Sequence, residues 1–239
     1  MTRLPRSIAT GFAVGAFAAL AACATDPAVG PSSPAAEAPA YRVGDRWVYQ
    51  GDDGFRVKTE WDETHEVTAI AADGIAVRIT LKGGIDVART ELWSAPGQVK
   101  VGAEYDNQTR RFTVPLERYD FPLAVGKSWN QWARSYNEFT KENGEINRYV
   151  RVGGWEKVAT PAGSFDAVKM QVLMRLDDET FWHWPTTCNY AVWYAPAVRG
   201  VVRAELDAQY AEKDGGLEGG AAVRTQHGVL QLVSFTPGR

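Results

Sequence analysis

The feature that most constrains this chain is a succession of short alternating or β-branched runs separated by turn residues. Runs of strand length occur at residues 75–81, 165–173, 201–206 and 228–235. Gly, Pro, Asp and Asn pairs of the kind that form tight turns recur between them, at intervals too short for useful helices. After residue 22 the sequence never keeps the apolar spacing of an amphipathic helix. The pattern therefore predicts an all-β domain.

Residues 41–239 are numerous enough to form one domain with a substantial core. Consecutive strands joined by tight turns predict a long antiparallel meander, and a sheet of many strands curls into a strongly curved open barrel or a sandwich. A hydrophobic fraction of 45% and a charged fraction of 23% are ordinary for globular proteins and exclude collagen-like or wholly disordered chains. Nine Trp residues are the unusual number.

A weak internal repeat runs through the domain. Three pairs of short segments recur in the same order: 43–47 with 125–129, Trp61 and Val67 with Trp155 and Val158, and 93–96 with 193–196. Two related halves are one explanation, and chance recurrence of hairpin punctuation is the other. The sequence leaves both open, and neither indicates a function.

The first 22 residues have the features of a secretory signal. Arg3 and Arg6 precede the apolar stretch GFAVGAFAALAA at 11–22, which is too short to span a bilayer stably. The run ends in Leu-Ala-Ala-Cys23, which resembles the lipobox of bacterial lipoproteins. That resemblance implies cleavage before Cys23, diacylation of its sulfur and palmitate-type acylation of the new amino group. Three acyl chains exceed the two membrane signals that stable anchoring requires.

The segment after Cys23 is rich in Pro and Ala and has no large apolar residue, so residues 23–40 predict an extended tether. Ala24, rather than Asp, follows the expected lipid site, as in enterobacterial lipoproteins of the outer membrane, and this predicts an anchor there facing the periplasm. Removal of residues 1–22 leaves a net charge of −5. An acidic surface argues against nucleic acid as a partner.

Four sequence blocks resemble a group of bacterial envelope lipoproteins of unknown function. The group shares the patterns VGxxWxY, PLxVGxxW, TPAGxFxA and WYxPxVGxV in this order, and here they occupy residues 41–49, 121–129, 158–169 and 192–203. The resemblance implies an open β-barrel similar to that of periplasmic lipoprotein carriers, and it implies no activity. Arg199 stands where the group usually has Gly, which predicts a shifted turn.

The sequence offers little for catalysis or metal binding. His65, His183 and His227 lie far apart, and the HxH, HExxH and CxxC patterns of metal sites are missing, so we predict no metal, no cofactor and no catalytic residue. His183 and Cys188 are close enough in sequence to suggest a nucleophile pair. Residues five apart on one strand face opposite ways, however, so a buried structural Cys188 is the preferred interpretation.

The segment 181–194 is the densest in aromatic residues. Consecutive aromatics on a strand point to both faces, so some of these rings lie away from the core. Such rings either line a binding site or are covered by a loop. Trp182, His183, Trp184 and Trp193 are therefore candidate ligand-binding residues.

Together these features predict a lipid-anchored envelope protein without enzymatic activity. Its curved β domain would bind an apolar or amphipathic ligand, or a partner protein. A hydrolase acting on envelope polymers is a second hypothesis and predicts a cleft with two carboxylates or a His with a nucleophile. A structural or assembly subunit of an envelope complex is a third.

Overall fold

The structure is a computed structural model that describes residues 34–54, 57, 59–83, 86–104, 106–213 and 222–239. The predicted signal segment, the Cys23 lipidation site and the first part of the tether lie outside these residues. Within the described ranges, no helix is both long and apolar enough to cross a membrane.

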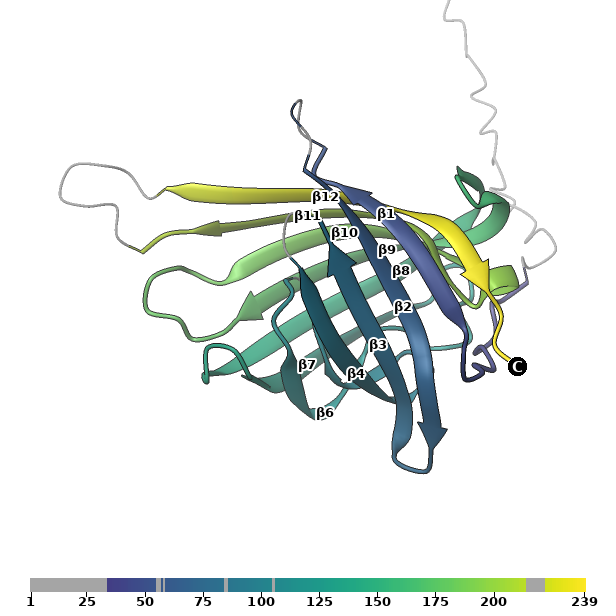
Figure 1. The fold of residues 1–239 in the computed structure, drawn as a ribbon. Coiled ribbons are helices and arrows are strands. Elements are labelled where there is room, and N and C mark those ends of the chain that lie inside the picture. The colour runs from purple at the N-terminus through teal and green to yellow at the C-terminus, as the bar shows by residue number, and fades with distance from the viewer. Residues whose placement is uncertain (1–33, 55–56, 58, 84–85, 105, 214–221) are drawn as a thin grey trace, which may run out of the picture. The chain divides into compact units, whose positions relative to one another are not determined.

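The described residues form twelve strands and a single short 3-10 helix, η1 (Pro196–Val198). The strands are β1 (Arg46–Asp52), β2 (Glu60–Ala71), β3 (Gly74–Lys82), β4 (Val87–Ala95), β5 (Gln98–Gly102), β6 (Arg110–Glu117), β7 (Ser128–Asn137), β8 (Asn143–Thr160), β9 (Gly163–Asp177), β10 (Thr186–Ala195), β11 (Gly200–Ala211) and β12 (Val223–Thr236). Each strand pairs antiparallel with the next along the chain, so the predicted all-β meander is confirmed (Figure 1).

The meander closes into a barrel, whereas the sequence predicted an open barrel or a sandwich. β1 pairs with β2 on one side and with β12 on the other, from Arg46 opposite Thr236 to Asp52 opposite Val229. Closure leaves neither terminal strand with an unpaired edge, which removes the usual template for aggregation. The four alternating runs found in the sequence lie within β3, β9, β11 and β12.

The recurring sequence segments occupy matching places six strands apart in the barrel. One pair comes just before β1 and β7, and another lies at the ends of β4 and β10. Gly44 and Gly126 both have a positive φ, near +90°, which Gly adopts without strain. Their N–H groups donate to the carbonyl oxygens of Val67 on β2 and Val152 on β8, at 2.8 and 3.0 Å. These matched bonds make Val152 the structural counterpart of Val67, in place of the Val158 suggested by the sequence.

The two ends of the barrel differ in how their strands are joined. At one end two-residue turns join β2 to β3, β4 to β5 and β8 to β9, beside the longer β6–β7 and β10–β11 connections, and at the other end every connection is longer than two residues. Part of the predicted tether lies at the first end. The N–H of Ala36 donates to the carbonyl of Leu123 at 3.1 Å and receives a bond in return, and Trp155 Nε1 donates to the carbonyl of Pro34 at 2.8 Å. The packed domain thus begins before residue 41.

Arg199 adopts a left-handed conformation, with φ of +53°. The turn before β11 therefore has the left-handed conformation that Gly would take at this position. Arg199 fits the unshifted turn, so the shift that the sequence predicted is not needed. The side chain donates two hydrogen bonds to the buried Asp45 carboxylate, at 3.1 and 2.5 Å. Paired contact with a carboxylate offsets the roughly 1–2 kcal/mol that a left-handed residue costs.

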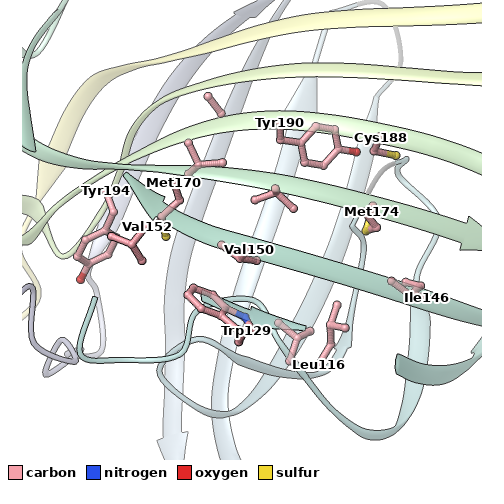
Figure 2. Packing of buried hydrophobic residues seen from close by; sticks show 14 of the residues in the cluster. Leu116, Trp129, Ile146, Val150, Val152, Met170, Met174, Cys188, Tyr190 and Tyr194 are labelled. Carbon is pink, nitrogen blue, oxygen red and sulfur yellow. The ribbon is translucent and has the colours of Figure 1, made fainter. Parts of the chain in front are cut away.

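The core lies on the inner face of the longest strands. Figure 2 shows side chains of β8, β9 and β10, such as Val150, Met170 and Tyr190, packed among their neighbours. Along much of β9 and β10 buried residues alternate with more exposed ones, as the pleat of a strand requires. This alternation decides which side chains reach the barrel interior.

Candidate functional site: a cavity within the barrel

The barrel encloses a cavity of about 1040 Å³. Side chains alone fill the interior of a barrel of about eight strands, and wider barrels leave room for ligands. A twelve-stranded barrel belongs to the wider class. The cavity is at the upper end of the range of small-molecule sites, which is about 300–1,000 Å³.

The cavity opens at the end of the barrel that has no two-residue turns. It is closed at the end where such turns join β2 to β3, β4 to β5 and β8 to β9. Phe139, in the β7–β8 connection, lines the cavity and is 76% exposed, which places the opening there. At the opposite end packed rings form a floor, with Tyr41 5.9 Å from Trp47 and 5.5 Å from Trp93 between ring centroids. Tyr194 packs in the same way 6.0 Å from Tyr119. These ring contacts pack the closed end with apolar surface.

Much of the cavity wall is apolar. These wall residues come from β3, β4 and β10–β12 and are Ile79, Leu81, Val87, Val192, Val201, Ala204, Leu206, Ala208 and Leu230. Trp61 and Tyr49 add aromatic surface. Such a wall favours hydrocarbon or ring systems, because apolar surface contributes roughly 25 cal/mol per Å² removed from water.

A group of buried charges lies in the same cavity. Arg118 donates to Glu91 Oε2 at 2.9 Å and to Glu104 Oε1 at 2.9 Å, and its Nη2 forms an ion pair with Glu104 Oε1 at 2.7 Å. Glu91 also accepts from Trp93 Nε1 at 2.8 Å. Burial alone would raise the pKa of Glu91, but Arg118 outweighs it and lowers the pKa to about 2. Glu91 is therefore a fixed anion within the wall.

A second acid, Glu63, faces the cavity from β2 and lies 2.5 Å from Nε2 of His65. Burial acts to raise the pKa of Glu63, but His65 and then Arg89 outweigh it and the pKa is lowered. The hydrolase hypothesis requires a carboxylic acid with a raised pKa to protonate a leaving group. Glu63 and Glu91 both have lowered pKa values, so the pair lacks the acid that this chemistry needs.

The loops around the opening are held by another buried group centred on Arg110. Arg110 donates to Asp178 Oδ1 at 3.1 Å and to Asp106 Oδ1 at 2.7 Å. Asn137 donates to Asp178 Oδ2 at 3.3 Å and accepts from the N–H of Phe139 at 2.9 Å. These bonds fix β6, β7 and β9 relative to one another where the cavity opens.

Three of the sequence-predicted binding residues lie together outside the cavity, in the β9–β10 connection. Trp182 is 44% exposed and Trp184 58%, and the His183 ring packs 4.7 Å from Tyr210 on β11. Lys213 Nζ lies 5.3 Å from the Trp184 ring centroid, a cation–π distance. None of the three is among the described residues that line the cavity.

Trp193, the fourth candidate, is far from the other three along β10. Its neighbours Val192 and Tyr194 line the cavity, so alternation places Trp193 on the outer face. Lys169 Nζ lies 4.7 Å from its ring centroid, and Nε1 donates to Glu156 Oε2 at 2.7 Å. The ring is only 6% exposed, so in this structure polar side chains cover it.

Cys188 is fully buried inside the barrel, as the sequence predicted for a structural cysteine. Burial raises the pKa of its thiol to about 12, which keeps it protonated and unreactive at neutral pH. His183 is half-buried in its loop and packs against Trp182 and Tyr210, so the structure does not unite His183 and Cys188 as a nucleophile pair. Across the described ranges no group of three or more His, Cys, Asp or Glu side chains is arranged to hold a metal.

Sequence reasoning missed the cavity residues Glu91, Glu104, Arg118 and Arg148. The sequence of β8 does indicate one of them. Arg148 stands two residues from both Ile146 and Val150, so alternation places its side chain on the same inward face as theirs. A charge within an apolar phase is the pattern of a buried functional or paired group. Arg118 and Glu104 lie in connections, where alternation gives no direction.

Two solved structures are similar to this fold. An inferred exported protein of Bacteroides fragilis with a YmcC-like fold has a TM-score of 0.50 at 16% identity, covering 85% of this chain and 100% of its own. An inferred lipoprotein of Parabacteroides distasonis has a TM-score of 0.50 at 14% identity, with the same coverage of 85% and 100%. No family model matches the sequence, and no curated protein matches it. At these identities the similarity establishes the fold, a YmcC-like β-barrel.

Proposed function

We propose that this protein is a lipid-anchored, non-enzymatic protein of the bacterial cell envelope that binds an amphipathic ligand inside its barrel. The observation that carries the proposal is the open cavity, which combines aliphatic and aromatic walls with buried charges. An apolar chain would contact the walls and a polar group would lie beside the charges.

The envelope location rests on the sequence and on the fold. The lipobox at Cys23 follows a signal-like segment. The two proteins of similar fold are described as exported and as a lipoprotein. We propose that the anchor lies in the outer membrane and holds the barrel in the periplasm.

The anchor is tested by labelling cells with palmitate. We expect the native chain to be labelled and the Cys23→Ser variant to lose the label. A Cys188→Ser variant is the matched control, because this thiol is buried, and it should keep the label. Equal labelling of the native chain and Cys23→Ser would disprove lipidation at this residue.

The ligand is tested by extracting the full chain carrying Cys23→Ser, which has no acyl chains of its own, with organic solvent and analysing the extract by mass spectrometry. An amphiphile recovered in stoichiometric amount is the expected result. Protein that is repeatedly empty, and that takes up no amphiphile when one is added, would contradict the proposal.

A partner protein is the second candidate, and the exposed rings of Phe181, Trp182 and Trp184 at the barrel opening favour it. A photo-crosslinking residue placed at Trp184 in intact cells should then yield one discrete cross-linked species. The same residue at Trp132, exposed on the outer face of β7, is the control. Identical products from the two positions would argue against a specific partner at the opening.

A further inference from the structure

One cation in the cavity wall is poorly compensated by its neighbours. Arg148 lies on β8 between Ile146 and Val150, and its side chain is only 4% exposed. Placing a guanidinium in an apolar phase costs several kcal/mol unless its charge and N–H groups are matched. The partners of Arg148 therefore decide whether the residue is structural.

The nearby carboxylates are committed to Arg118. Glu104 Oε1 accepts a hydrogen bond from Arg118 Nε and lies 2.7 Å from its Nη2 as an ion pair, and Glu91 accepts from Arg118 and Trp93. Arg148 Nε lies 3.8 Å from Glu104 Oε2, beyond hydrogen-bond distance, and this buried atom has no acceptor. Both acids thus hydrogen-bond to Arg118, and neither forms a hydrogen bond with Arg148.

The hydrogen bonds that Arg148 does make go to neutral groups. Nη1 donates to the backbone carbonyl oxygens of Glu117 and Arg118, at 3.1 and 2.8 Å. Carbonyl oxygens satisfy donors but carry no net charge. Burial lowers the pKa of Arg148, and Glu104 only partly opposes it. The guanidinium is therefore held in place beside the cavity by carbonyl oxygens, with no hydrogen-bonded carboxylate among the described residues.

We infer that Arg148 binds the anionic end of the amphipathic ligand, so that the ligand is an amphiphile with one carboxylate or phosphate headgroup. A ligand anion would supply the charged acceptor that Arg148 Nε lacks, and its chain would lie along Val192, Leu206 and Leu230. Glu91 and Glu104 each accept a hydrogen bond from Arg118, and Glu63 contacts His65, so each of these acids has a bonded partner other than Arg148. The inference rests on the proposed function, since it requires a ligand in the cavity.

The experiment compares three amphiphiles of equal chain length on the full chain carrying Cys23→Ser. Dodecanoate, dodecyl phosphate and dodecanol are titrated against bound N-phenyl-1-naphthylamine, a neutral fluorescent dye. An ion-paired hydrogen bond contributes roughly 1.5–3 kcal/mol, so we expect at least one anion to displace the dye at about tenfold lower concentration than dodecanol. The anion that does so distinguishes a carboxylate ligand from a phosphate ligand.

Substitution assigns the preference to one residue. Arg148→Met should reduce the anion preference to about twofold or less while dye binding persists. Arg151→Met, an exposed position on the same strand, should leave the preference unchanged. Arg148→Lys should keep part of it, because a charge remains. Urea unfolding of Arg148→Met checks that the variant is folded before its binding is compared.

The outcomes separate this inference from the function on which it rests. Equal displacement by dodecanol and both anions on the native side chain, or a preference that survives in Arg148→Met, would overturn the role of Arg148 and leave ligand binding intact. A folded chain that binds neither the dye nor any of the three amphiphiles would instead overturn the proposed function. The comparison of head groups needs no Arg148 variant, so it holds even if Arg148→Met fails to fold.

Discussion

Arg110 shows how single buried charges hold the barrel opening together. Its side chain has no exposed surface and binds Asp106 and Asp178 together. Removing one partner of a buried ion pair typically costs about 3–5 kcal/mol, because the remaining charge is left unmatched. We predict a loss of this size in the free energy of unfolding for Arg110→Met, measured by urea denaturation.

The neighbouring Arg111 provides the control for this prediction. It pairs with Glu138 on the surface and is largely exposed. Exposed ion pairs contribute about 0–1 kcal/mol, so Arg111→Met should unfold almost as the native chain does. Equal losses for the two variants would show that the Arg110 cluster does not hold the loops.

Glu91 makes stability depend on pH in a defined window. Its pKa is about 2 in the folded chain, below the roughly 4.3 of an unfolded Glu. A lowered folded pKa gives stability that is complete above the unfolded pKa and is lost as pH falls towards the folded pKa. The contribution is therefore present at neutral pH and disappears between about pH 4.5 and 2.

A Glu91→Gln variant isolates this contribution. We expect it to be less stable than the native chain by about 3 kcal/mol at pH 7, with the difference shrinking as pH falls to 2. Thermal unfolding across the pH series measures both quantities. Glu60→Gln, at an exposed position, should follow the native curve. A difference that stays constant with pH would refute the assigned linkage.

At the scale of the strand, the turns before β1 and β7 impose the same backbone conformation. Gly126 has a φ of +87°, and a Cβ there would meet no atom within 4 Å. Gly126→Ala should therefore cost about 1–2 kcal/mol through backbone strain alone. Gly154→Ala also meets no atom but carries no positive φ, so it should cost less. Chemical denaturation of the two variants makes the comparison, and equal costs would contradict the strain argument.

The seam between β6 and β7 has a short hydrogen-bonded ladder. Only Arg110, Arg111 and Phe112 of β6 form backbone pairs with β7. Pro115 lacks the N–H that a continuing ladder would need. The Gln131 side chain replaces part of the ladder, accepting from the N–H of Glu117 at 2.7 Å and donating to the carbonyl of Pro115 at 2.9 Å. One amide side chain thus joins two strands that have separated.

At the scale of the whole molecule, local patterns predicted the elements better than their closure. Alternation and turn residues were sufficient for an all-β meander, because these signals act within a few residues. Closure depends on the pairing of β1 with β12, whose residues are separated by nearly the whole chain. No local pattern specifies that pairing, so the sequence left an open barrel and a sandwich as alternatives.

The candidate site was less predictable for the same reason. The aromatic residues at 181–184 are adjacent in the sequence and can be recognised there as a cluster. The cavity-lining residues Trp93, Arg118 and Arg148 come from separate parts of the chain. Arg148 could have been found from the phase of its strand. The candidate binding role of Arg148 could not be found in this way. That role depends on the ion pair between Glu104 and Arg118, which lie far from Arg148 in the sequence.

The central claim, that the barrel interior is a binding site, is tested most directly by filling it. Ala208 is a small residue that lines the cavity on β11, and Gln209 beside it is exposed on the outer face. The full chain carrying Cys23→Ser, with Ala208→Trp or Gln209→Trp added, is titrated with N-phenyl-1-naphthylamine after circular dichroism has confirmed folding. We predict saturable binding without either Trp and with Gln209→Trp, and affinity reduced by about tenfold or more with Ala208→Trp. Undiminished binding by a folded Ala208→Trp variant would place the dye outside the barrel and contradict the account.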